Sequence, residues 1–306
     1  MIKVENITKK FDDYKALDNI TCNIPEGCIY GMVGSNGAGK STFLRVISGI
    51  YRPEAGTAMI DEQPIWENSE VKGKIAFVPD DLFFLHGASL DRMASLYRAS
   101  YPDFDDKRYQ YLTDTFKLNR TKNIATFSKG MKRQAATILA ISSKPKYLFM
   151  DETFDGLDPV MRNLVKKLIC QDVEERKATA IMTSHSLREL EDTCDQLALL
   201  HKGGLIFESD ISNLKTSLFK VQVAYSEEYD RTRFEGIDGM EVMHFSKQGS
   251  VANIIVRGDR ENVVRIISST HPILVEVLPL TLEEVFTYEM EALGYAFGDV
   301  LMDQEV

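Results

Sequence analysis

One segment of the chain has the residue types and the spacing of a phosphate-binding loop. It fits the pattern G-x-x-x-x-G-K-[ST] at every defined position and reads Gly34-Ser35-Asn36-Gly37-Ala38-Gly39-Lys40-Ser41. Glycines at this spacing let the backbone curl so that successive N–H groups point at phosphate oxygens. Lys40 can then reach the β- and γ-phosphates, Ser41 can ligate Mg²⁺, and Thr42 adds a donor. A chance glycine turn would also need the flanking strand and helix, so the segment predicts a nucleoside-triphosphate site.

Two acidic residues that could complete such a site follow a short apolar run. Asp151 and Glu152 come directly after Tyr147–Met150. A parallel strand buried on both faces is hydrophobic throughout and carries its functional groups at the carboxyl end. We expect Asp151 to hold Mg²⁺, through water or through Ser41, and Glu152 to polarise a water toward the γ-phosphate. Such a pair can also cap a helix, but the phosphate loop favours the catalytic interpretation.

A histidine follows the next apolar run along the chain. The sequence Thr183-Ser184-His185 ends a predicted strand at 178–183. A lone histidine is usually structural, but ligands of parallel sheets bind at the carboxyl edge of the strands. We therefore expect His185 to hydrogen-bond the γ-phosphate.

These residues need a scaffold that brings several strand ends and one helix start together. Alternating strands and helices predict an α/β fold with a mixed or parallel core sheet and helices on both faces. Pro102 and the polar residues around Asn119 interrupt a long helical stretch, which predicts an inserted helical subdomain at about 88–143. The periodicity predicts strands at 2–7, 20–24, 28–33, 147–150, 178–183 and 197–200, and helices after Lys40, within 90–143, after Pro159 and at 186–194.

The pattern of apolar and polar residues changes from about residue 214. Period-two runs predict strands at 219–225, 251–256 and 273–277, and a helix is expected at 259–269. Thr281-Leu282-Glu283-Glu284 is a capping-box start for a last helix. We therefore predict an ATP-binding-type α/β domain at 1–215 and a small α+β domain at 216–306.

Composition limits the class of protein. The chain has 306 residues, 44% of them hydrophobic and 27% charged, with a formal net charge of -10. This balance is typical of globular proteins, and the acidity argues against a nucleic-acid partner. The cysteines form no C-x-x-C pair, so reduced thiols in a cytosolic protein are expected. No run approaches the roughly 18 apolar residues needed to cross a bilayer. If the protein serves transport, another chain must supply the pore.

A further segment carries a resemblance to a known family. Phe127-Ser128-Lys129-Gly130-Met131-Lys132-Arg133-Gln134 resembles the L-S-G-G-Q signature of the ATP-binding-cassette (ABC) ATPases, and Gly156-Leu157-Asp158-Pro159 matches their D-loop. Together with the phosphate loop and the acid pair, the resemblance covers roughly residues 1–215. It implies a P-loop NTPase fold that binds and hydrolyses ATP.

The resemblance also implies how the site is completed. Two copies, or this chain and a paired ATPase subunit, are expected to enclose two ATP molecules head to tail. Ser128 and Gly130 would bind the γ-phosphate held by the opposite subunit, which suits the start of a helix, and Asp158 would cross the interface. Phe11 matches the aromatic residue that stacks on adenine, although Tyr14 is a nearby competitor and either ring could belong to the core.

Several positions depart from the family pattern. Lys129 replaces the first signature glycine, Met131 its glutamine, and Asp155 the small serine before Gly156. The family's glutamine loop is expected after Phe77-Val78-Pro79, where this chain has Asp80. An aspartate there can still order a water on Mg²⁺, so Asp80 is a further candidate metal residue. Lys40, Asp151, Glu152 and His185 are all retained, and we expect hydrolysis.

Two further segments resemble those of one branch of the family. Ser100–Asp105 and the ending Leu280–Phe286 look like segments of ATPase subunits of bacterial multidrug and lantibiotic-type exporters. We therefore expect the ATPase subunit of an exporter, peripheral on the inner face of the membrane beside a separate transmembrane permease. Leu82–Leu85 could receive that partner if it is exposed, or it could be buried. The alternatives are a soluble ABC ATPase that acts on ribosomes or DNA, and a regulatory nucleotide sensor.

Overall fold

The computed structural model describes residues 1–152 and 154–292. The chain divides into two compact units, Met1–Glu208 and Ser209–Val306. Of the expected C-terminal domain, residues 293–306 lie outside the described part.

The first unit is built around a six-stranded sheet with the order β10-β9-β3-β8-β7-β6. The neighbours β9/β3, β3/β8, β8/β7 and β7/β6 pair in parallel. Every residue of β3, β7 and β8 is buried, as expected for parallel strands covered on both faces. The strands are β3 (Ile29–Val33), β6 (Ile75–Val78), β7 (Tyr147–Met150), β8 (Thr179–Ser184), β9 (Gln196–His201) and β10 (Gly204–Asp210).

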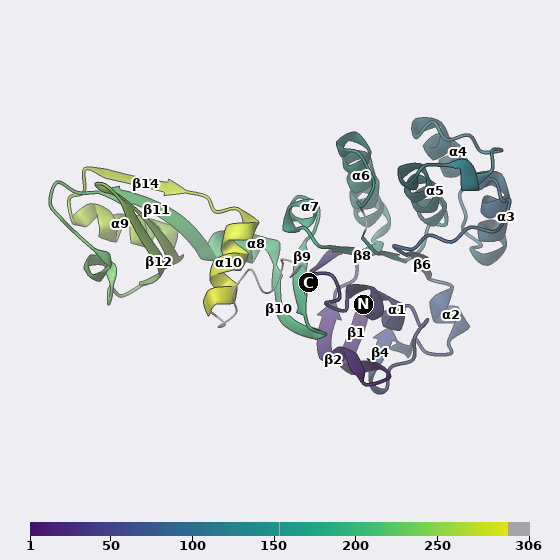
Figure 1. Ribbon diagram of the computed structural model, residues 1–306, viewed down its shortest axis with the longest axis horizontal. Helices are drawn as coiled ribbons and strands as arrows, with labels where there is room; N and C mark the ends of the chain where they lie inside the picture. Colours follow the sequence, from purple (N-terminus) through teal and green to yellow (C-terminus); the bar gives the residue numbers. More distant parts are fainter. Residues whose placement is uncertain (153, 293–306) are drawn as a thin grey trace. The chain divides into compact units, whose positions relative to one another are not determined.

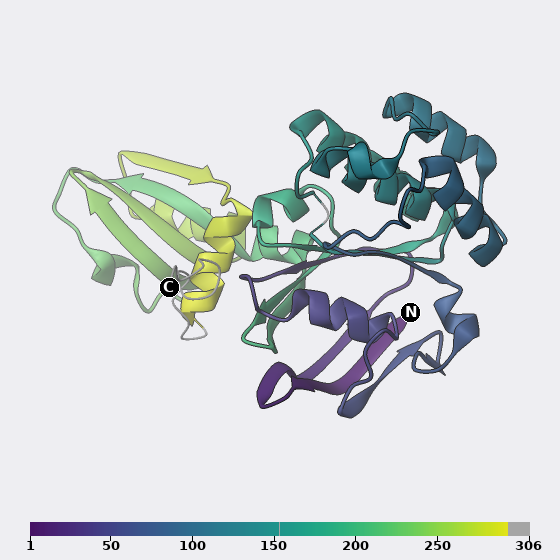
Figure 2. The same ribbon diagram turned by 45° about the vertical axis from the view of Figure 1, so that its right-hand side comes forward.

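The two faces of this sheet are covered differently. Figures 1 and 2 show helices α5 (Lys129–Ser142), α6 (Pro159–Arg176) and α7 (Leu187–Glu191) on one side and helix α1 (Lys40–Ile47) on the other. Helix α1 buries Phe43, Leu44 and Ile47 in a core shared with both sheets of the unit. That burial fixes the start of α1, and with it the phosphate loop, against the end of β3.

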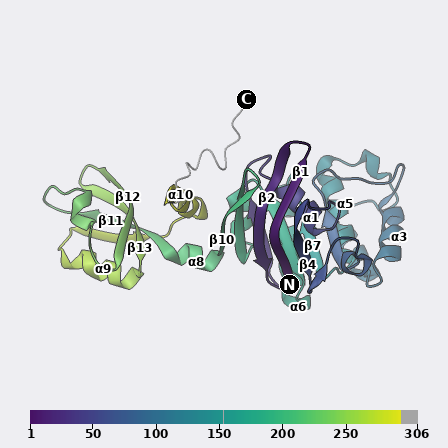
Figure 3. The ribbon, with the colours of Figure 1, turned by 90° about the horizontal axis from the view of Figure 1, so that it is seen from below.

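A second sheet lies beyond α1 and was not predicted. It is four-stranded, with the order β2-β1-β4-β5, and its pairs are antiparallel. Figure 3 shows β1 and β2 side by side across this layer. The expectation of helices on both faces was therefore incomplete, because one helix and this sheet share the second face. The strands are β1 (Ile2–Phe11), β2 (Tyr14–Ile24), β4 (Ala55–Ile60) and β5 (Gln63–Pro64).

The second sheet and the central sheet are joined by a polar contact at Asp61. Its carboxylate accepts hydrogen bonds from Tyr147 Oη at 2.6 Å and from Lys146 Nζ at 3.1 and 3.2 Å. Partial burial alone would raise the pKa of Asp61, but the hydrogen bonds from Tyr147 and Lys146 outweigh it and lower the pKa to about 2. The ionised form is thus favoured by folding.

We expect Asp61→Asn to change how stability depends on pH. A lowered folded-state pKa contributes stability that is complete above the unfolded pKa of about 3.9 and is lost as pH falls toward 2. Because the side chain is only 23% exposed, we expect a contribution of about 1–2 kcal/mol at pH 7. Urea unfolding of both proteins measures it. The wild-type advantage in free energy of unfolding should shrink between pH 7 and pH 3, and a constant difference would contradict the assignment.

The helices predicted between residues 90 and 143 are confirmed. They are α3 (Leu90–Ser100), α4 (Asp106–Thr115) and α5, and each begins at a side-chain cap: Ser89, Asp105 or Ser128. Helix α3 ends just before Tyr101-Pro102, because a proline disfavours the helical conformation of the residue that precedes it. Between α1 and this group lies the short helix α2 (Ser69–Lys72), and the 3-10 turn Ile124–Thr126 leads into α5.

The second unit is an α+β structure. Its antiparallel sheet has the order β12-β13-β11-β14, and α9 packs Val263 and Ile267 into the core of that sheet. The capping box is confirmed, because Thr281 N donates to Glu284 Oε2 and Glu284 N donates to Thr281 Oγ1. Half-exposed β12 was not predicted. The elements are α8 (Ile211–Ser217), β11 (Leu218–Ala224), β12 (Met240–Gln248), β13 (Val251–Gly258), α9 (Arg260–Ser269), β14 (Leu274–Leu278) and α10 (Leu282–Ala292).

Across residues 1–152 and 154–292, no helix combines the length and the apolar character needed to cross a membrane.

Candidate functional site

The phosphate loop connects the end of β3 to the start of α1, as predicted. Two of its glycines are required by close backbone approaches. A Cβ at Gly34 would lie 2.4 Å from Leu200 O, and one at Gly39 would lie 2.6 Å from Ala16 O. Gly39 also has a φ of 107°, a backbone conformation that residues with a side chain rarely adopt. The loop therefore wraps closely over neighbouring backbone, which is the curled conformation of loops whose N–H groups cradle an anion.

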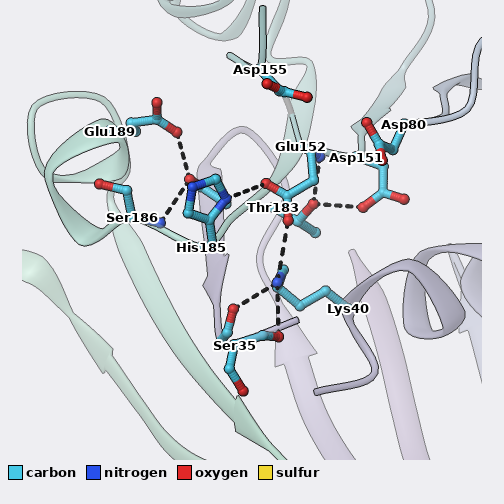
Figure 4. A network of polar contacts seen from close by, with 12 residues as sticks. Ser35, Lys40, Asp80, Asp151, Glu152, Asp155, Thr183, His185, Ser186 and Glu189 are labelled. Carbon is cyan, nitrogen blue, oxygen red and sulfur yellow. Dashed lines mark hydrogen bonds and ion pairs between the residues drawn. The ribbon is translucent and has the colours of Figure 1, made fainter. Parts of the chain in front are cut away.

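Lys40 is the buried cation of this loop. Its Nζ donates to Gly34 O at 2.6 Å and to Ser35 O at 3.2 Å, and it lies 3.2 Å from Glu152 Oε1. The side chain is only 5% exposed. Lys40 is thus held over the loop by backbone carbonyls, with the Glu152 carboxylate as its counter-charge (Figure 4).

Asp151 has the environment of a metal ligand. It is fully buried, and Oδ1 accepts a hydrogen bond from Thr183 Oγ1 at 2.7 Å. Its Oδ2 has no hydrogen-bond partner in the described part of the chain. Buried polar atoms are normally satisfied, so an orphaned carboxylate oxygen beside a phosphate loop fits a bound cation. The residues present therefore fit Mg²⁺.

Glu152 is placed by an unusual backbone and by the neighbouring strand. Its φ is 43°, and its N–H donates to Thr183 Oγ1 at 2.8 Å. Its Oε2 lies 3.1 Å from His185 Nδ1. Figure 4 shows the carboxylate between Lys40 and His185. One side chain thus connects the phosphate loop with the end of β8.

Thr183 is a site residue that sequence reasoning did not assign. The parallel register pairs Met150 with Met182. Asp151, directly after β7, and Thr183 of β8 are therefore neighbours. One hydroxyl then serves both acids, as donor to the Asp151 carboxylate and as acceptor from the Glu152 N–H. Its position directly before Ser184-His185 was the available signal, but the register was needed to interpret it.

A single pocket gathers many of the predicted residues. Tyr14 Oη donates to Gly37 O at 3.3 Å, and the exposed ring of Phe11 packs edge-on against Tyr51 with centroids 5.4 Å apart. Both rings therefore remain candidates for stacking on a base. The pocket is lined by Phe11, Tyr14, Ala16, Asn36, Gly37, Ala38, Gly39, Lys40, Ser41, Thr42, Asp80 and Glu152.

Comparison with known proteins identifies the family of this site. Residues 17–155 match the family model described as ABC transporter. YtrB, an ABC transporter ATP-binding protein of Bacillus subtilis, is 28% identical over 94% of this chain and 97% of its own length. DrrA of Streptomyces peucetius, a daunorubicin/doxorubicin resistance ATP-binding protein, is 30% identical over 71% of this chain and 67% of its own. The chain belongs to the ATP-binding proteins of ABC transporters.

The fold of an ABC ATPase is shown as well. A dimeric ATP-binding cassette solved in a post-hydrolysis state with ADP and Pi has a TM-score of 0.62, with 22% identity over 69% of this chain and 99% of that one. The resemblance read from the signature segment is therefore confirmed, together with the α/β class. The protein is an ATP-binding subunit of the ABC ATPase family, and ATP is its nucleotide.

The pocket lining leaves out several predicted site residues, namely Gly34, Ser35, Asp151 and His185, and the three that the ABC pattern assigns to the opposite subunit, Ser128, Gly130 and Asp158. Ser128 caps α5, accepting from Met131 N at 3.2 Å. Asp158 caps α6, accepting from Val160 N at 2.9 Å and Met161 N at 3.0 Å. A Cβ at Gly130 would lie 2.6 Å from Gly156 O. Their roles across an interface stay predictions.

Asp80 lines the pocket but is already engaged. Its Oδ1 accepts from the buried Arg133 at 2.7 Å. Its role as a metal residue stays a prediction. Arg133 belongs to the signature segment, but its partner could not be predicted from the sequence.

Proposed function

We propose that this ABC ATPase hydrolyses Mg·ATP with Lys40, Ser41, Asp151, Glu152 and His185. The observation that carries the proposal is the arrangement of the two acids. Asp151 has one buried oxygen without a partner, and Glu152 contacts both the phosphate-loop lysine and His185. A metal-binding acid and a water-orienting acid beside a triphosphate cradle are the parts that phosphoryl transfer requires.

Each side chain has a distinct task. Asp151 and Ser41 would hold Mg²⁺, with Asp80 as a further metal residue. The metal would supply positive charge that stabilises the negative charge developing on the phosphate oxygens. Lys40 stabilises the transferring phosphoryl group, Glu152 orients the attacking water, and His185 hydrogen-bonds the γ-phosphate. Phe11 stacks on the adenine.

The working unit is a dimer that encloses two ATP molecules. Ser128 and Asp158 cap α5 and α6, and Gly130 lies in the first turn of α5; the start of a helix suits contact with a phosphate held by the opposite subunit. The similar cassette with ADP and Pi is dimeric. A second copy of this chain, or a paired ATPase subunit, completes each site, and closure and reopening follow binding and hydrolysis.

The partner is a transmembrane permease, and the direction is export. Phe83 is 79% exposed and Leu85 37% exposed, so the segment after Asp80 offers an apolar surface for a helix of that partner. Export is supported by the exporter-like segments Ser100–Asp105 and Leu280–Phe286 and by the resistance role in the name of DrrA. The protein then works at the inner face of the membrane.

Co-purification from detergent-solubilised membranes tests the partner. We expect the tagged protein to recover a polytopic membrane protein, and Phe83→Ser to reduce that recovery about tenfold, because it removes an anchor of the interface. Tyr111→Ser is the matched control, since Tyr111 is also an exposed aromatic residue, 66% exposed on α4. Recovery of ribosomes or DNA in place of a membrane protein would contradict the transport function.

A further inference from the structure

Two basic residues near the start of α5 form ion pairs with two acids on separate loops. Arg133 pairs with Asp80 at 2.7 Å, and Lys129 pairs with Asp155 at 2.6 Å. Three of these residues, Asp80, Lys129 and Asp155, are positions at which the chain departs from the family pattern. We refer to the four residues as the charged clasp. We propose that the clasp positions the signature segment for its contact with the opposite subunit, and that Arg133 is its main positioning residue. This inference rests on the dimer proposed above.

In the Arg133 half of the clasp the arginine is buried, its partner Asp80 is 48% exposed, and the arginine connects three elements. The Arg133 side chain is 1% exposed. One of its terminal nitrogens donates to Pro79 O at 2.8 Å and to Asp151 O at 3.2 Å, and the other donates to Asp80 O at 3.2 Å and Oδ1 at 2.7 Å. The planar guanidinium thus ties α5 to the residues that follow β6 and β7, in a geometry that a lysine could not reproduce.

Arg133 lies in the same helix as the signature segment, close to its start. Ser128 caps α5, and Gly130 and Arg133 are three residues apart, so they share a face of the helix. Gly130 packs so closely on Gly156 O that a Cβ would lie 2.6 Å away. The first turn of α5 therefore cannot rotate or slide without breaking the Arg133 contacts or pressing Gly130 against Gly156 of the D-loop.

The Lys129 half of the clasp is exposed and weaker. Lys129 is 71% exposed and Asp155 40% exposed. The hydrogen bond from Lys129 lowers the pKa of Asp155, so the pair is charged at neutral pH. Exposed pairs contribute little to stability, whereas loss of the Asp80 carboxylate would leave the buried charge of Arg133 without its acidic partner. The half that contains the buried arginine should therefore dominate the position of the helix.

Asp80 is the member of the clasp that also faces the nucleotide. It lines the pocket formed by the phosphate loop, and it lies beside Asp151 (Figure 4). Among the described residues, Asp80 is the acidic side chain that forms an ion pair with Arg133. A single side chain thus joins the edge of the nucleotide site to the helix that presents Ser128 and Gly130. The departure from glutamine to aspartate makes this contact ionic.

The test uses ATP-dependent dimerisation in a Glu152→Gln background, measured by analytical ultracentrifugation at saturating Mg·ATP. We expect Asp80→Asn to raise the dimer dissociation constant about tenfold and Asp155→Asn to raise it about threefold or less. Asp80→Glu keeps the charge and should restore most of the affinity. Asp81→Asn is the matched control, because Asp81 is the adjacent exposed aspartate. Asp80→Asn leaves the buried Arg133 without its acidic partner, so the melting temperature of each variant is measured as well, and only folded variants are compared.

The readouts separate the possible outcomes. Binding of a fluorescent ATP analogue to the monomer is measured without Mg²⁺, so that the metal role proposed for Asp80 does not enter. It should stay within about threefold for Asp80→Asn, because Lys40 and the loop are unchanged. A large loss of that binding would mean that Asp80 acts on the nucleotide directly, and it would overturn the inference. Equal dimerisation of the Asp80→Asn and Asp81→Asn proteins would overturn it as well. Failure of the Glu152→Gln parent to bind ATP or to dimerise would instead reject the proposed function.

Discussion

Glu152→Gln lowers the steady-state ATPase rate by about a hundredfold or more, the expected effect of removing a base that orients water. The same variant binds Mg·ATP at least as tightly as the wild type. Glu152 places a carboxylate 3.2 Å from Lys40, and a neutral amide removes one negative charge beside the triphosphate. Binding without turnover should then trap the ATP-bound dimer. The rate of phosphate release and the mass of the complex at saturating ATP measure both effects.

A matched substitution separates this role from a general loss of charge. Glu174 is an exposed glutamate on α6, where glutamine is an equally good helix former. Glu174→Gln should keep the wild-type rate. If Glu152→Gln turns over ATP at the wild-type rate, Glu152 is not the residue that orients water, and the contact with His185 at 3.1 Å is structural.

The grouping of the candidate site residues was predictable from the sequence because parallel strands place their last residues at one edge of the sheet. The apolar runs before Asp151 and His185 predict two neighbouring strands, and the glycine pattern predicts the loop that faces them. In the structure the Glu152 carboxylate contacts both Lys40 and His185, while the catalytic roles of the three residues stay predictions. Each of these residues is marked by a local pattern that needs no knowledge of distant neighbours.

The contacts that join separate elements could not be predicted. Thr183 serves both acids only because the register pairs Met150 with Met182, and no local pattern encodes register. Arg133 reaches Asp80, which is far away in the sequence, only through the packing of α5 against the sheet. Both contacts depend on how elements pack.

Two of the unpredicted strands have a different explanation. Strand β4 contains Gly56 and is mostly exposed in its first half, and β12 is buried only at Met240. Strand prediction relies on alternation between buried apolar and exposed polar residues. Where a strand is half-exposed along its length, that alternation is weak, and its place in the sheet is decided by its partners, β1 and β13.

Lys40→Met should abolish measurable ATP binding, and this second large effect tests the phosphate loop itself. The ammonium is buried at 5% exposure and held by two loop carbonyls, so it is pre-positioned for phosphate oxygens. Charge-assisted hydrogen bonds contribute about 1.5–3 kcal/mol each. The loss of two such bonds weakens binding by about a hundredfold or more. Methionine keeps most of the side-chain volume, and titration with a fluorescent ATP analogue measures the change.

The interpretation depends on the variant staying folded, and a second lysine supplies the comparison. Removal of the ammonium leaves Gly34 O and Ser35 O without a donor and Glu152 without its counter-charge. We therefore expect a moderate drop in melting temperature, measured without nucleotide. Lys122→Met alters an exposed lysine and should change neither quantity. A folded Lys40→Met protein that binds Mg·ATP as tightly as the wild type would show that the loop does not hold the triphosphate, because the ammonium is the one full positive charge that the loop contributes.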